Sequence, residues 1–412
     1  MKSSRHIRII FFTLMLDMIG VGILIPIVPY IFDLRSPYYL LNGFNPSHGY
    51  VWQGLALALY PLFQFFFAPI LGELSDQYGR KRLLLLSLGG TLIGHMLTGF
   101  AILTGDIWLF LLGSAIDGAT AGNIAIAMAS IADVSEDKDK AKNFGMVGAA
   151  FGVGFILGPA FGGIIASHFG YAAPFWFSTF LSLINIIGIY YFMRETKTNT
   201  HLGLTPNPSP QERGTIQIRL HPLAGVANVI RGFKDKSLSN IFWVNLLFQS
   251  GFAFYTAFAG VYMKERFHLD LSQVAYYFVY VGICIVLAQA LLIRHVFKRW
   301  PAINILKVSV PMLASVILIY IFSYNIYINL VMVPIFTIAF GLSNSAVTSI
   351  ISKKAGSRQG LVLGISASIV ALAGAVPQAL AGLLASTLGY VAPMYATVGL
   401  MISTLFFIKR EE

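Results

Sequence analysis

Three ionisable side chains, Asp17, His95 and Asp117, each interrupt a long apolar run of the sequence. Burial in an apolar medium disfavours the charged form of a carboxyl group, at a cost of at least ~2.5 kcal/mol in the middle of a bilayer. Such a group can take up and release a proton under physiological gradients, and histidine ordinarily titrates in the same range. We therefore expect proton transfer from these residues, although each could instead hydrogen-bond to a neighbour and serve packing alone.

A charged segment, GELSDQYGRKR (residues 72–82), separates two of the apolar runs. Its distinctive residues are Gly72, Asp76, Gly79, Arg80 and Lys81. Asp76 and Arg80 are four residues apart and can pair if the segment is helical, and the glycines permit tight turns and close backbone approach. A plain basic turn would need neither the glycines nor Asp76. We interpret the segment as a charge lock that holds one closed arrangement of the two halves of the protein.

The composition excludes an ordinary soluble protein. Of the 412 residues, 57% are hydrophobic and 11% are charged, and the mean hydropathy is +0.74, whereas a soluble domain carries about 25% charged residues. Apolar runs of about 20 residues, the length of a membrane-spanning helix, recur along the chain, and a β-barrel would show short alternating segments instead. The single cysteine, Cys284, excludes a disulfide framework within the chain. We expect an all-α polytopic membrane protein.

The apolar runs predict twelve transmembrane helices. They cover approximately residues 7–32, 50–71, 83–104, 107–131, 143–167, 170–193, 237–263, 272–293, 303–323, 326–352, 361–387 and 390–408. The first run is too long for a cleaved signal peptide and contains Asp17, so we expect it to be the first transmembrane helix.

Basic residues are distributed unevenly between the segments that join these helices. If the N-terminus is cytoplasmic, 25 of the 28 Lys and Arg residues fall in cytoplasmic segments, and the outer loops hold only Arg35, Lys264 and Arg266. This is the positive-inside bias, so both termini are expected in the cytoplasm. The net charge of +11 therefore reports topology and does not indicate a nucleic-acid partner.

Residues 194–236 differ from the rest of the chain because they are polar, and TPNPSPQERG (205–214) is typical of an extended, poorly ordered linker. The linker divides the chain into two six-helix bundles, residues 1–193 and 237–412, which we expect to be pseudo-symmetric around a central substrate site. A basic turn follows the second span of each half. Within the linker, residues 221–235 have apolar residues at helical spacing. They predict either a short helix on the inner membrane face or a partly ordered loop.

The charged segment resembles the signature loop of the major facilitator superfamily, G-x-L-x-D-x-x-G-R-[RK]-x. The stretches LDMIGVGILIPIVPYI (16–31), which contains Asp17, and SIADVSEDKDKAKNFG (130–145) are similar to the twelve-helix drug:proton antiporters, and most closely to the tetracycline/proton exporters. The resemblance covers nearly the whole chain and is more specific in the first half. It implies a proton-coupled exporter with a functional acid at Asp17.

The fifth span carries the antiporter pattern G-x-x-x-G-P-x-x-G-G within GAAFGVGFILGPAFGG. Its residues here are Gly154, Gly158, Pro159, Gly162 and Gly163. The first, second and fourth lie four apart on one helix face, so a neighbouring helix can approach closely, and the proline favours a bend. We expect a hinge or seal between the two halves, and in the family this pattern marks exporters rather than importers.

The chain departs from the family pattern in the fourth span, where R-x-x-Q-G is replaced by SAIDG (114–118), so the arginine is absent and Asp117 takes the place of the glutamine. Ile285 occupies the place of a histidine of tetracycline exporters. Those exporters also carry an acid in the ninth span, and here no acid lies near Pro311, the matching position. Tetracycline is therefore not assumed as the substrate. The remaining candidates are neutral and could either contact substrate or hydrogen-bond between helices. These candidates are Asn123, Asn245, Gln249, Tyr255, Gln289, Asn344 and Gln378.

We therefore expect a secondary active transporter that exports a small amphipathic, drug-like compound in exchange for protons by alternating access. Its expected partners are the substrate, protons and the lipid bilayer, and we expect a monomer in the bacterial inner membrane. No G-x-x-x-x-G-K-[ST] phosphate loop occurs, so neither an enzyme nor a nucleotide-driven pump is expected, and no cofactor is required.

Three alternatives remain open at this point. A metal or metal-chelate exporter, such as a siderophore exporter, would use Asp17, Asp117 and His95 as oxygen and nitrogen ligands, although we expect no resident metal. A non-transporting membrane receptor would need neither the membrane acids nor the complete pattern of the fifth span. An uptake symporter is disfavoured by that same pattern.

Overall fold

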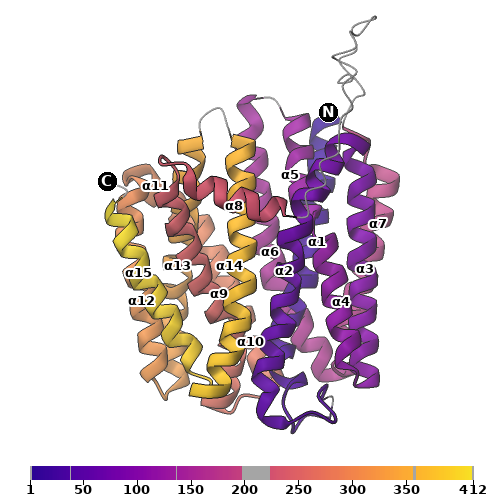
Figure 1. The fold of residues 1–412 in the computed structure, drawn as a ribbon, viewed down its shortest axis with the longest axis vertical. Helices are drawn as coiled ribbons and strands as arrows, with labels where there is room; N and C mark the ends of the chain where they lie inside the picture. The colour runs from indigo at the N-terminus through magenta and orange to yellow at the C-terminus, as the bar shows by residue number, and fades with distance from the viewer. Residues whose placement is uncertain (1, 38, 136, 197–222, 356–358, 411–412) are drawn as a thin grey trace, which may run out of the picture.

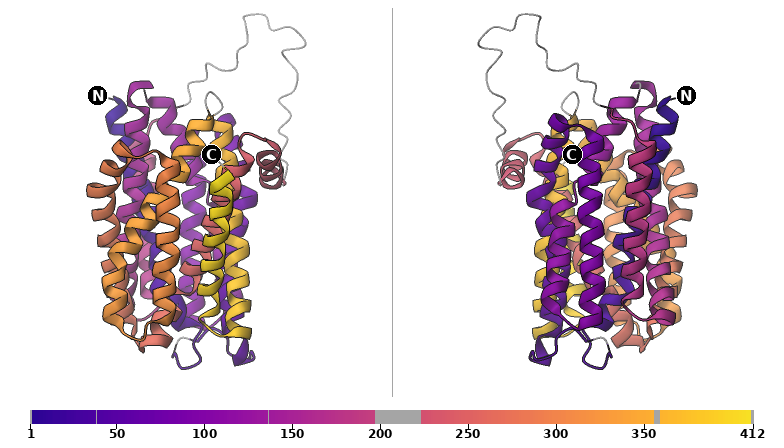
Figure 2. Two further views of the ribbon diagram at one scale, coloured as in Figure 1. Left: turned by 90° about the vertical axis from the view of Figure 1, so that its left-hand side faces the viewer. Right: turned by 90° about the vertical axis from the view of Figure 1, so that its right-hand side faces the viewer.

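The computed structural model describes residues 2–37, 39–135, 137–196, 223–355 and 359–410. Throughout this part of the chain every regular element is a helix, as the sequence predicts. The long helices run side by side along the longest axis (Figure 1). Both chain termini lie toward one end of the molecule, here called the terminal end, and the opposite end is called the far end (Figures 1 and 2).

The helices before the linker are α1 (Lys2–Ile31), η1 (Pro46–His48), α2 (Gly49–Tyr78), α3 (Arg80–Thr104), α4 (Ile107–Thr120), α5 (Asn123–Val134), α6 (Asp137–Phe169) and α7 (Ala173–Phe192). Those after it are α8 (Ala224–Lys234), α9 (Ser239–Phe267), α10 (Leu271–Leu287), η3 (Ala288–Ile293), α11 (Arg294–Arg299), α12 (Ala302–Phe322), α13 (Ile326–Ala355), α14 (Gln359–Leu388) and α15 (Ala392–Arg410).

Ten helical segments of the described chain are long and apolar enough to cross a membrane. Two more of the expected spans, residues 143–167 and 272–293, coincide with the shorter apolar helices Ile156–Phe169 and Leu271–Leu287. Helices dominate because a bilayer offers no water to satisfy backbone N–H and C=O groups, which must therefore bond within each segment.

The span expected over residues 107–131 is present as the candidate membrane span Ile107–Val134, but its helix is interrupted. The helix breaks after Thr120, and α5 starts at Asn123. At the break the Gly122 N–H bonds to the carbonyl of Thr120, and the freed carbonyl of Ala121 accepts from the side chain of Gln64 in α2 at 3.4 Å. Side chains of neighbouring helices can satisfy such freed groups, so a broken helix is tolerated within a membrane.

The eighth span also differs from its expected form. It passes from α10 into a π-helical segment, η3, and then into α11, so residues 294–300, expected as a basic turn, are mostly helical. Of the two alternatives for residues 221–235, the structure has the helix, α8, which packs against α2, α9 and α14. The extended linker predicted for residues 205–214 lies outside the described residues.

Helix α6 is packed between α1 of the first half and α10 of the second half. A Cβ atom added at Gly158 would lie 2.6 Å from the Cα atom of Gly22 in α1, and one added at Gly162 would overlap the Ile23 carbonyl. On another side of α6, a Cβ atom at Gly163 would overlap Ala275 of α10. The close approach expected from the glycine pattern is therefore present, and it involves two partner helices.

Helices α2 and α14 form a second extensive contact between the halves. Gly54 of α2 and Gly382 of α14 face each other, so a Cβ atom at Gly54 would lie 2.8 Å from the Cα atom of Gly382. Nearer the middle of α2, Pro61 lies against Gly374. Close backbone contacts of this kind strengthen the van der Waals packing between helices, which is one of the main forces that hold helices together in a membrane.

Gly158→Val should destabilise the protein because its side chain cannot fit between α6 and α1. Overpacking of this kind typically costs about 1–3 kcal/mol, so the unfolding temperature of the detergent-solubilised protein should fall. Gly89→Val is the matched control, because a Cβ atom at Gly89 in α3 meets no atom within 4 Å. Equal unfolding temperatures for the two variants would contradict the close α1–α6 contact.

Candidate functional site

Asp17, His95 and Asp117, predicted separately from the sequence, are brought together by α1, α3 and α4. The Nε2 atom of His95 lies 3.9 Å from an Oδ2 atom of Asp117, which is an ion-pair distance if the imidazole is protonated. Asp17 is close enough to Asp117 for their carboxyl groups to interact, and its exposed fraction is only 7%. Two carboxyl groups and one imidazole therefore form a single buried cluster in the first half.

Small residues make room for this cluster. A Cβ atom added at Gly20 would lie 2.8 Å from Cε1 of His95, so the imidazole rests on the bare backbone of α1 one turn from Asp17. Likewise, a Cβ atom at Gly94 in α3 would lie 2.8 Å from Cβ of Asp117. Replacing either glycine would push the ionisable groups apart.

Neutral polar groups surround the acids. The side chain of Asn123, located just after the break between α4 and α5, is in hydrogen-bonding reach of Asp17, and Thr91 of α3 is in reach of Asp117. Tyr60 of α2 lies close to both carboxyl groups, and its carbonyl contacts Gly118. The sequence analysis missed Tyr60 because a tyrosine within an apolar run has no distinctive signal.

Two atoms of the cluster are buried without a hydrogen-bond partner, namely Oδ2 of Asp17 and Nδ1 of His95. Buried polar atoms are normally satisfied, so unsatisfied atoms at an ionisable cluster point to a proton, a water or a ligand in another state of the protein. In the described part of the chain, no group of three or more His, Cys, Asp or Glu side chains is arranged to hold a metal ion.

The neutral candidates of the second half separate into different environments. Gln249 of α9 donates to Oδ1 of Asn344 in α13 at 3.3 Å. Asn245 of α9 donates to Ser366 of α14 at 3.1 Å.

Tyr255 is buried beside the hydroxyl group of Tyr277. Gln378 of α14 keeps a buried Oε1 atom without a partner, whereas Gln289 is exposed in η3. The candidate contacts of the second half therefore do not converge on a single point.

The charged segment of residues 72–82 is organised around Arg80. Its guanidinium lies 2.5 Å from Asp76, the expected i,i+4 pair, and donates to Asp133 of α5 at 3.1 Å and to Ser75 at 2.6 Å. The Arg80 side chain is only 10% exposed, whereas that of Asp76 is 62% exposed. Lys81 donates to the carbonyl of Tyr190 in α7 at 2.7 Å.

A residue beyond the segment, Glu195, completes this arrangement. Its two carboxylate oxygens accept from the backbone N–H groups of Arg80 at 2.8 Å and Lys81 at 3.2 Å, which are the first donors of α3. An acid at a helix N-terminus satisfies free N–H groups and faces the positive end of the helix dipole. Gly79, with φ of 101°, lies directly under this carboxylate, so a side chain there would be both strained and obstructed.

Asp133 and Glu195 were missed as partners of the segment because they lie far from it in sequence. The side-chain hydrogen bonds and ion pairs of Arg80 and Lys81 described above stay within the first half, and Glu195 lies at the start of the linker that follows it. The lock that the sequence predicts between the two halves is therefore not among these contacts, which instead fix the α2–α3 turn to α5 and α7.

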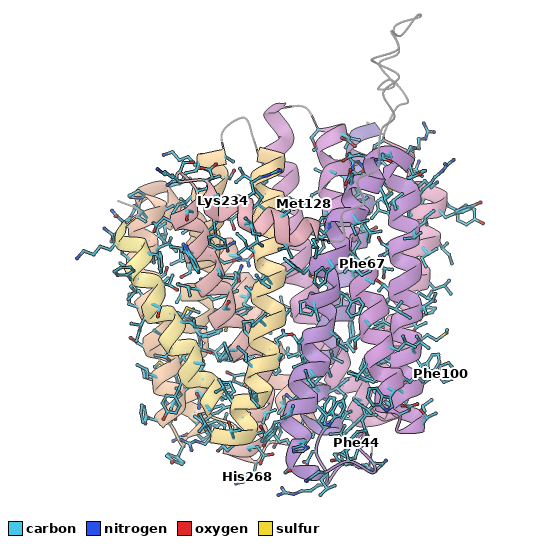
Figure 3. All side chains as sticks on the ribbon, viewed as in Figure 1. Phe44, Phe67, Phe100, Met128, Lys234 and His268 are labelled. Atoms are coloured by element: carbon cyan, nitrogen blue, oxygen red, sulfur yellow. The ribbon has the colours of Figure 1, made fainter. Side chains whose placement is uncertain are left out.

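Several hydrogen bonds that join the two halves lie toward the far end. Lys264 at the end of α9 pairs with Asp33 just after α1 and donates to the carbonyl of Pro29 at 3.3 Å. Tyr30 donates to the carbonyl of Leu269 at 2.8 Å, and the Lys264 ammonium lies 5.3 Å from the centre of its ring. We call the Asp33–Lys264 pair the far-end latch; His268 marks this end of the molecule in Figure 3.

A third link, nearer the middle of the helices, reinforces the far-end latch. Gln53 of α2 is almost fully buried and donates to the carbonyl of Ala257 in α9 at 3.1 Å. Sequence analysis had assigned Lys264 only to membrane topology, so its role in joining the halves is visible only in the structure.

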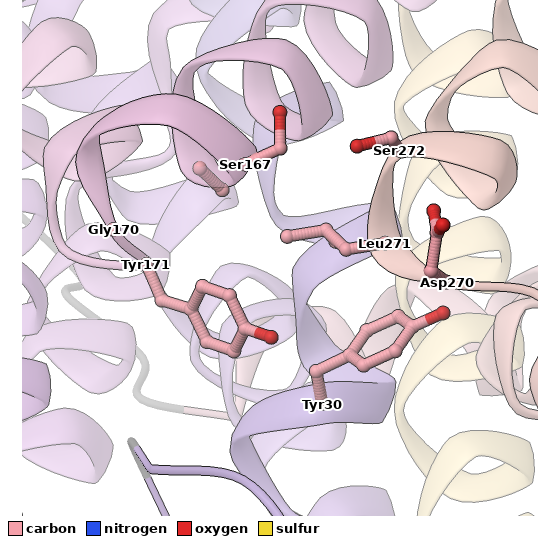
Figure 4. Close-up of a pocket in the computed structure, with 8 residues that line it drawn as sticks. Tyr30, Ser167, Gly170, Tyr171, Asp270, Leu271 and Ser272 are labelled. Atoms are coloured by element: carbon pink, nitrogen blue, oxygen red, sulfur yellow. The ribbon is translucent and has the colours of Figure 1, made fainter.

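A recess of about 440 Å³ lies beside the latch, between the end of α6 and the start of α10 (Figure 4). It is lined by Tyr30, Ala166, Ser167, Gly170, Tyr171, Asp270, Leu271 and Ser272. Asp270 caps α10 by accepting from the Gln273 N–H at 2.9 Å. The recess is therefore part of the far-end closure and is separate from the buried acids.

The Asp33 carboxyl group remains ionised well into the acidic range. Partial burial alone would raise its pKa, but the hydrogen bond and charge of Lys264 and the backbone N–H of Arg35 together lower the pKa below the ordinary value of 3.8. A carboxyl group with a lowered pKa stabilises the folded arrangement above its ordinary pKa, and this contribution disappears as the pH falls through the lowered value. Mild acidity therefore does not open the latch.

The structure combines membrane-length helices, ionisable groups buried among them and a closure at one end. This arrangement is typical of a membrane transport protein. The family model of the Major Facilitator Superfamily matches residues 10–378, and the chain belongs to that superfamily. The family membership expected from the charged segment is thus confirmed.

Two relatives and one solved structure are similar to the chain over most of its length. The chain is 28% identical over 325 residues to the tetracycline resistance protein, class H, of Pasteurella multocida. The aligned region covers 77% of this chain and 74% of that protein. It is 24% identical over 412 residues to the quinolone resistance protein NorA of Staphylococcus aureus (strain COL), covering 99% and 97%. The solved structure of the human organic anion transporter MFSD10 (TETRAN) has a TM-score of 0.75 and 21% identity, covers 98% and 99% of the two chains, and shows that the fold is shared.

Asp76→Asn and Arg80→Ala should leave membrane insertion and protein level near normal but reduce transport severely, at least about tenfold, because they loosen the α2–α3 turn that must move with the first half. Transport is measured in cells and normalised to protein level. Glu73→Gln is the matched control, since Glu73 is an exposed acid of the same segment. Unchanged transport in both test variants would reduce the segment to a topology signal.

The latch predicts energetic coupling between Asp33 and Lys264. A double-mutant cycle with Asp33→Asn and Lys264→Met, read by thermal unfolding in detergent, should give a coupling energy of about 0.5–3 kcal/mol at neutral pH. The coupling should persist at about pH 5, which is above the ordinary pKa of aspartate. Additivity in the Asp33 cycle, or loss of coupling by about pH 5, would contradict the latch.

Proposed function

We propose that this protein is a proton-driven exporter of a small amphipathic compound. The observation that carries the proposal is the buried cluster of Asp17, Asp117 and His95, in which proton-binding atoms of Asp17 and His95 have no hydrogen-bond partner. Ionisable groups inside a membrane are costly and typically mark proton or substrate pathways. Membership of the superfamily and the names of two relatives, which confer tetracycline and quinolone resistance, support export of drug-like molecules.

The topology that we propose has twelve transmembrane helices in two six-helix bundles, residues 1–193 and 237–412, joined by a linker at residues 194–236. Both termini are cytoplasmic, so the terminal end faces the cytoplasm and the far end faces outward. The placement of 25 of the 28 basic residues in the cytoplasmic segments supports this orientation. The proposed location is the bacterial inner membrane, where the protein acts as a monomer without a cofactor.

Alternating access follows from the contacts between the halves. The far-end latch and the Tyr30–Leu269 bond hold the outer side together, and the glycine surfaces of α6 provide a smooth contact on which α1 and α10 can shift. Opening toward the outside requires the Asp33–Lys264 pair to separate. Proton and substrate binding near the middle of the helices would bias this two-state equilibrium.

The coupling step that we propose depends on the charge of Asp17. In its ionised form the carboxylate needs water or a partner, which keeps the surrounding space open. Protonation removes this cost, because a neutral carboxyl group is far easier to bury. Substrate release and proton uptake are then linked through competition at one carboxyl group, while Asn123 and Asp117 tune its protonation.

The buried acids also restrict the substrate. Asp17 and Asp117 favour a neutral or cationic compound over an anion, and the apolar helices favour one that is partly apolar. Growth of an efflux-deficient host with tetracycline, a fluoroquinolone and lipophilic cations would identify the class. Selective export of a polycarboxylate would overturn this assignment.

Two other functions are distinguished by the same measurements. A metal-chelate exporter would confer tolerance to a metal complex rather than to organic cations. A non-transporting receptor would bind a ligand without moving protons.

Asp17→Asn should abolish proton-driven accumulation, with at least about a tenfold loss, while downhill exchange of substrate survives, because asparagine imitates the permanently protonated state. The measurement uses proteoliposomes with an imposed pH gradient and an internal dye that reports substrate-induced proton movement. Asp117→Asn should give a milder defect if it only tunes Asp17, and an equal one if the two acids share the proton. Full gradient-driven transport by Asp17→Asn would leave Asp117 or His95 as the proton carrier.

A further inference from the structure

A cleft at the terminal end lies between α8, the start of α9 and the end of α15. It has a volume of about 330 Å³ and is lined by Phe233, Lys236, Ser239, Asn240, Trp243 and Phe407. We call it the α8 cleft; Lys234, the neighbour of Phe233 in the chain, marks this region in Figure 3. None of the lining residues belongs to the buried acid cluster or to the far-end recess, so the cleft is a separate site.

Helix α8 lies across the long helices rather than along them (Figure 1), and Figure 2 shows it on the outer side of the helical assembly. Its inner face packs tightly, since a Cβ atom added at Gly225 would overlap the carbonyl of Phe65 in α2. The outer side leaves Ile230 exposed by 49%, and Leu223 at the start of the helix is exposed by 51%. Exposed apolar side chains on a helix in this orientation are typical of a helix at a membrane surface.

Three aromatic rings, one from each helix, form the apolar wall of the α8 cleft. The ring centroids of Phe233 in α8 and Trp243 in α9 are 4.5 Å apart, and Trp243 stacks on Phe407 of α15 at 5.7 Å with an interplanar angle of 23°. Trp243 is still 38% exposed. Tryptophan is enriched where lipid headgroups meet the hydrocarbon, so the wall offers a surface for the upper part of a lipid chain.

Basic residues gather at the cleft. Arg231, Lys234 and Lys236 are all exposed, and Lys236 lines the cleft itself. Asp235 is the only acid between residues 223 and 240, and its carboxylate accepts from the N–H group of Ser237 at 3.0 Å and from its hydroxyl group at 2.7 Å. The positive charge therefore exceeds the negative charge along this stretch, and it favours an anionic ligand.

Neutral polar groups complete the cleft. The amide of Asn240 donates to the carbonyl of Phe407 at 2.8 Å, which fixes the start of α9 to the end of α15. Ser239 is partly buried in the cleft, and its hydroxyl group can donate to a phosphate oxygen. Lys236 and Ser239 thus offer donors for a phosphate, and Trp243 lies one turn further along α9, beside them.

We propose that the α8 cleft binds one anionic phospholipid, with its phosphate at Lys236 and Ser239 and its acyl chains along Trp243 and Phe407. The exposed ring of Trp243 favours a lipid over a soluble phosphate, which would use the basic side of the cleft alone. Basic pockets on the cytoplasmic side of a membrane protein suit such headgroups, and the terminal end is the side for which we propose that orientation. The lipid site goes beyond the proposed export function and uses none of its residues.

The test measures lipid binding to the purified full-length protein by native mass spectrometry in a neutral detergent. The probes are dioleoylphosphatidylglycerol, which is anionic, and dioleoylphosphatidylcholine, which is zwitterionic and has the same acyl chains. The protein should prefer the anionic lipid, and Lys236→Gln should reduce this preference about fivefold, the worth of one basic contact. Lys236→Arg should keep it. Lys298→Gln is the matched control, because Lys298 is an exposed lysine of α11 that does not line the cleft.

Glycerol 3-phosphate distinguishes a lipid from a soluble phosphate, because it carries the phosphate without acyl chains. Added in excess, it should leave the bound phosphatidylglycerol in place. Displacement of the lipid by glycerol 3-phosphate would assign the cleft to a soluble anion. That result, equal binding of the two lipids, or equal losses in Lys236→Gln and Lys298→Gln would overturn the proposal.

A second measurement locates the acyl chains. Tryptophan fluorescence of the wild-type protein and of Trp243→Phe is compared in phosphatidylcholine nanodiscs that contain a small fraction of phosphatidylglycerol with brominated chains. Bromine quenches nearby indoles, so the wild-type protein should be quenched more than Trp243→Phe, and brominated phosphatidylcholine at the same fraction should give no such difference. Equal quenching of the two proteins by the anionic lipid would contradict the site. Neither measurement depends on transport, so failure of the proposed export function would leave the result unaffected.

Discussion

Hydrocarbon cannot solvate a charge or an unpaired backbone group, and the rest of this structure depends on that constraint. Regular helices satisfy the backbone internally, and at the break between α4 and α5 the side chain of Gln64 takes over that role. The buried charges are gathered rather than scattered. Asp17, Asp117 and His95 occupy one cluster, in which glycines supply the room and Asn123 supplies a polar neighbour.

The same constraint explains how the halves are joined. Lipid is as apolar as a leucine side chain, so helices in a membrane associate through close packing and selected polar bonds rather than through a hydrophobic force. Gly158 of α6 and Gly22 of α1 bring two backbones into contact, and Gly163 brings α6 against α10. Surfaces without side chains can shift past one another with little obstruction, which suits the alternating access that we propose.

The two ends of the molecule use charge differently. At the terminal end, Arg80 is fixed by Asp133 within the first half, while Glu195, at the start of the linker, caps the start of α3. At the far end, Lys264 and Asp33 join the two halves. One set of charges therefore makes the first half rigid, and the other stabilises one arrangement of the halves relative to each other. In the transport cycle that we propose, conformational change breaks the second set and preserves the first.

The sequence alone determined the helical class, the approximate spans and the family, because these depend on local hydropathy and on motifs of contiguous residues. It also named Asp17, His95 and Asp117 individually, since a charge in an apolar run is visible without a fold. The tertiary structure decided their convergence, the latch between Asp33 and Lys264 and the capping by Glu195. Each of these joins residues distant in the chain, and distances across a helical assembly depend on how the helices pack, which no local pattern of residues records.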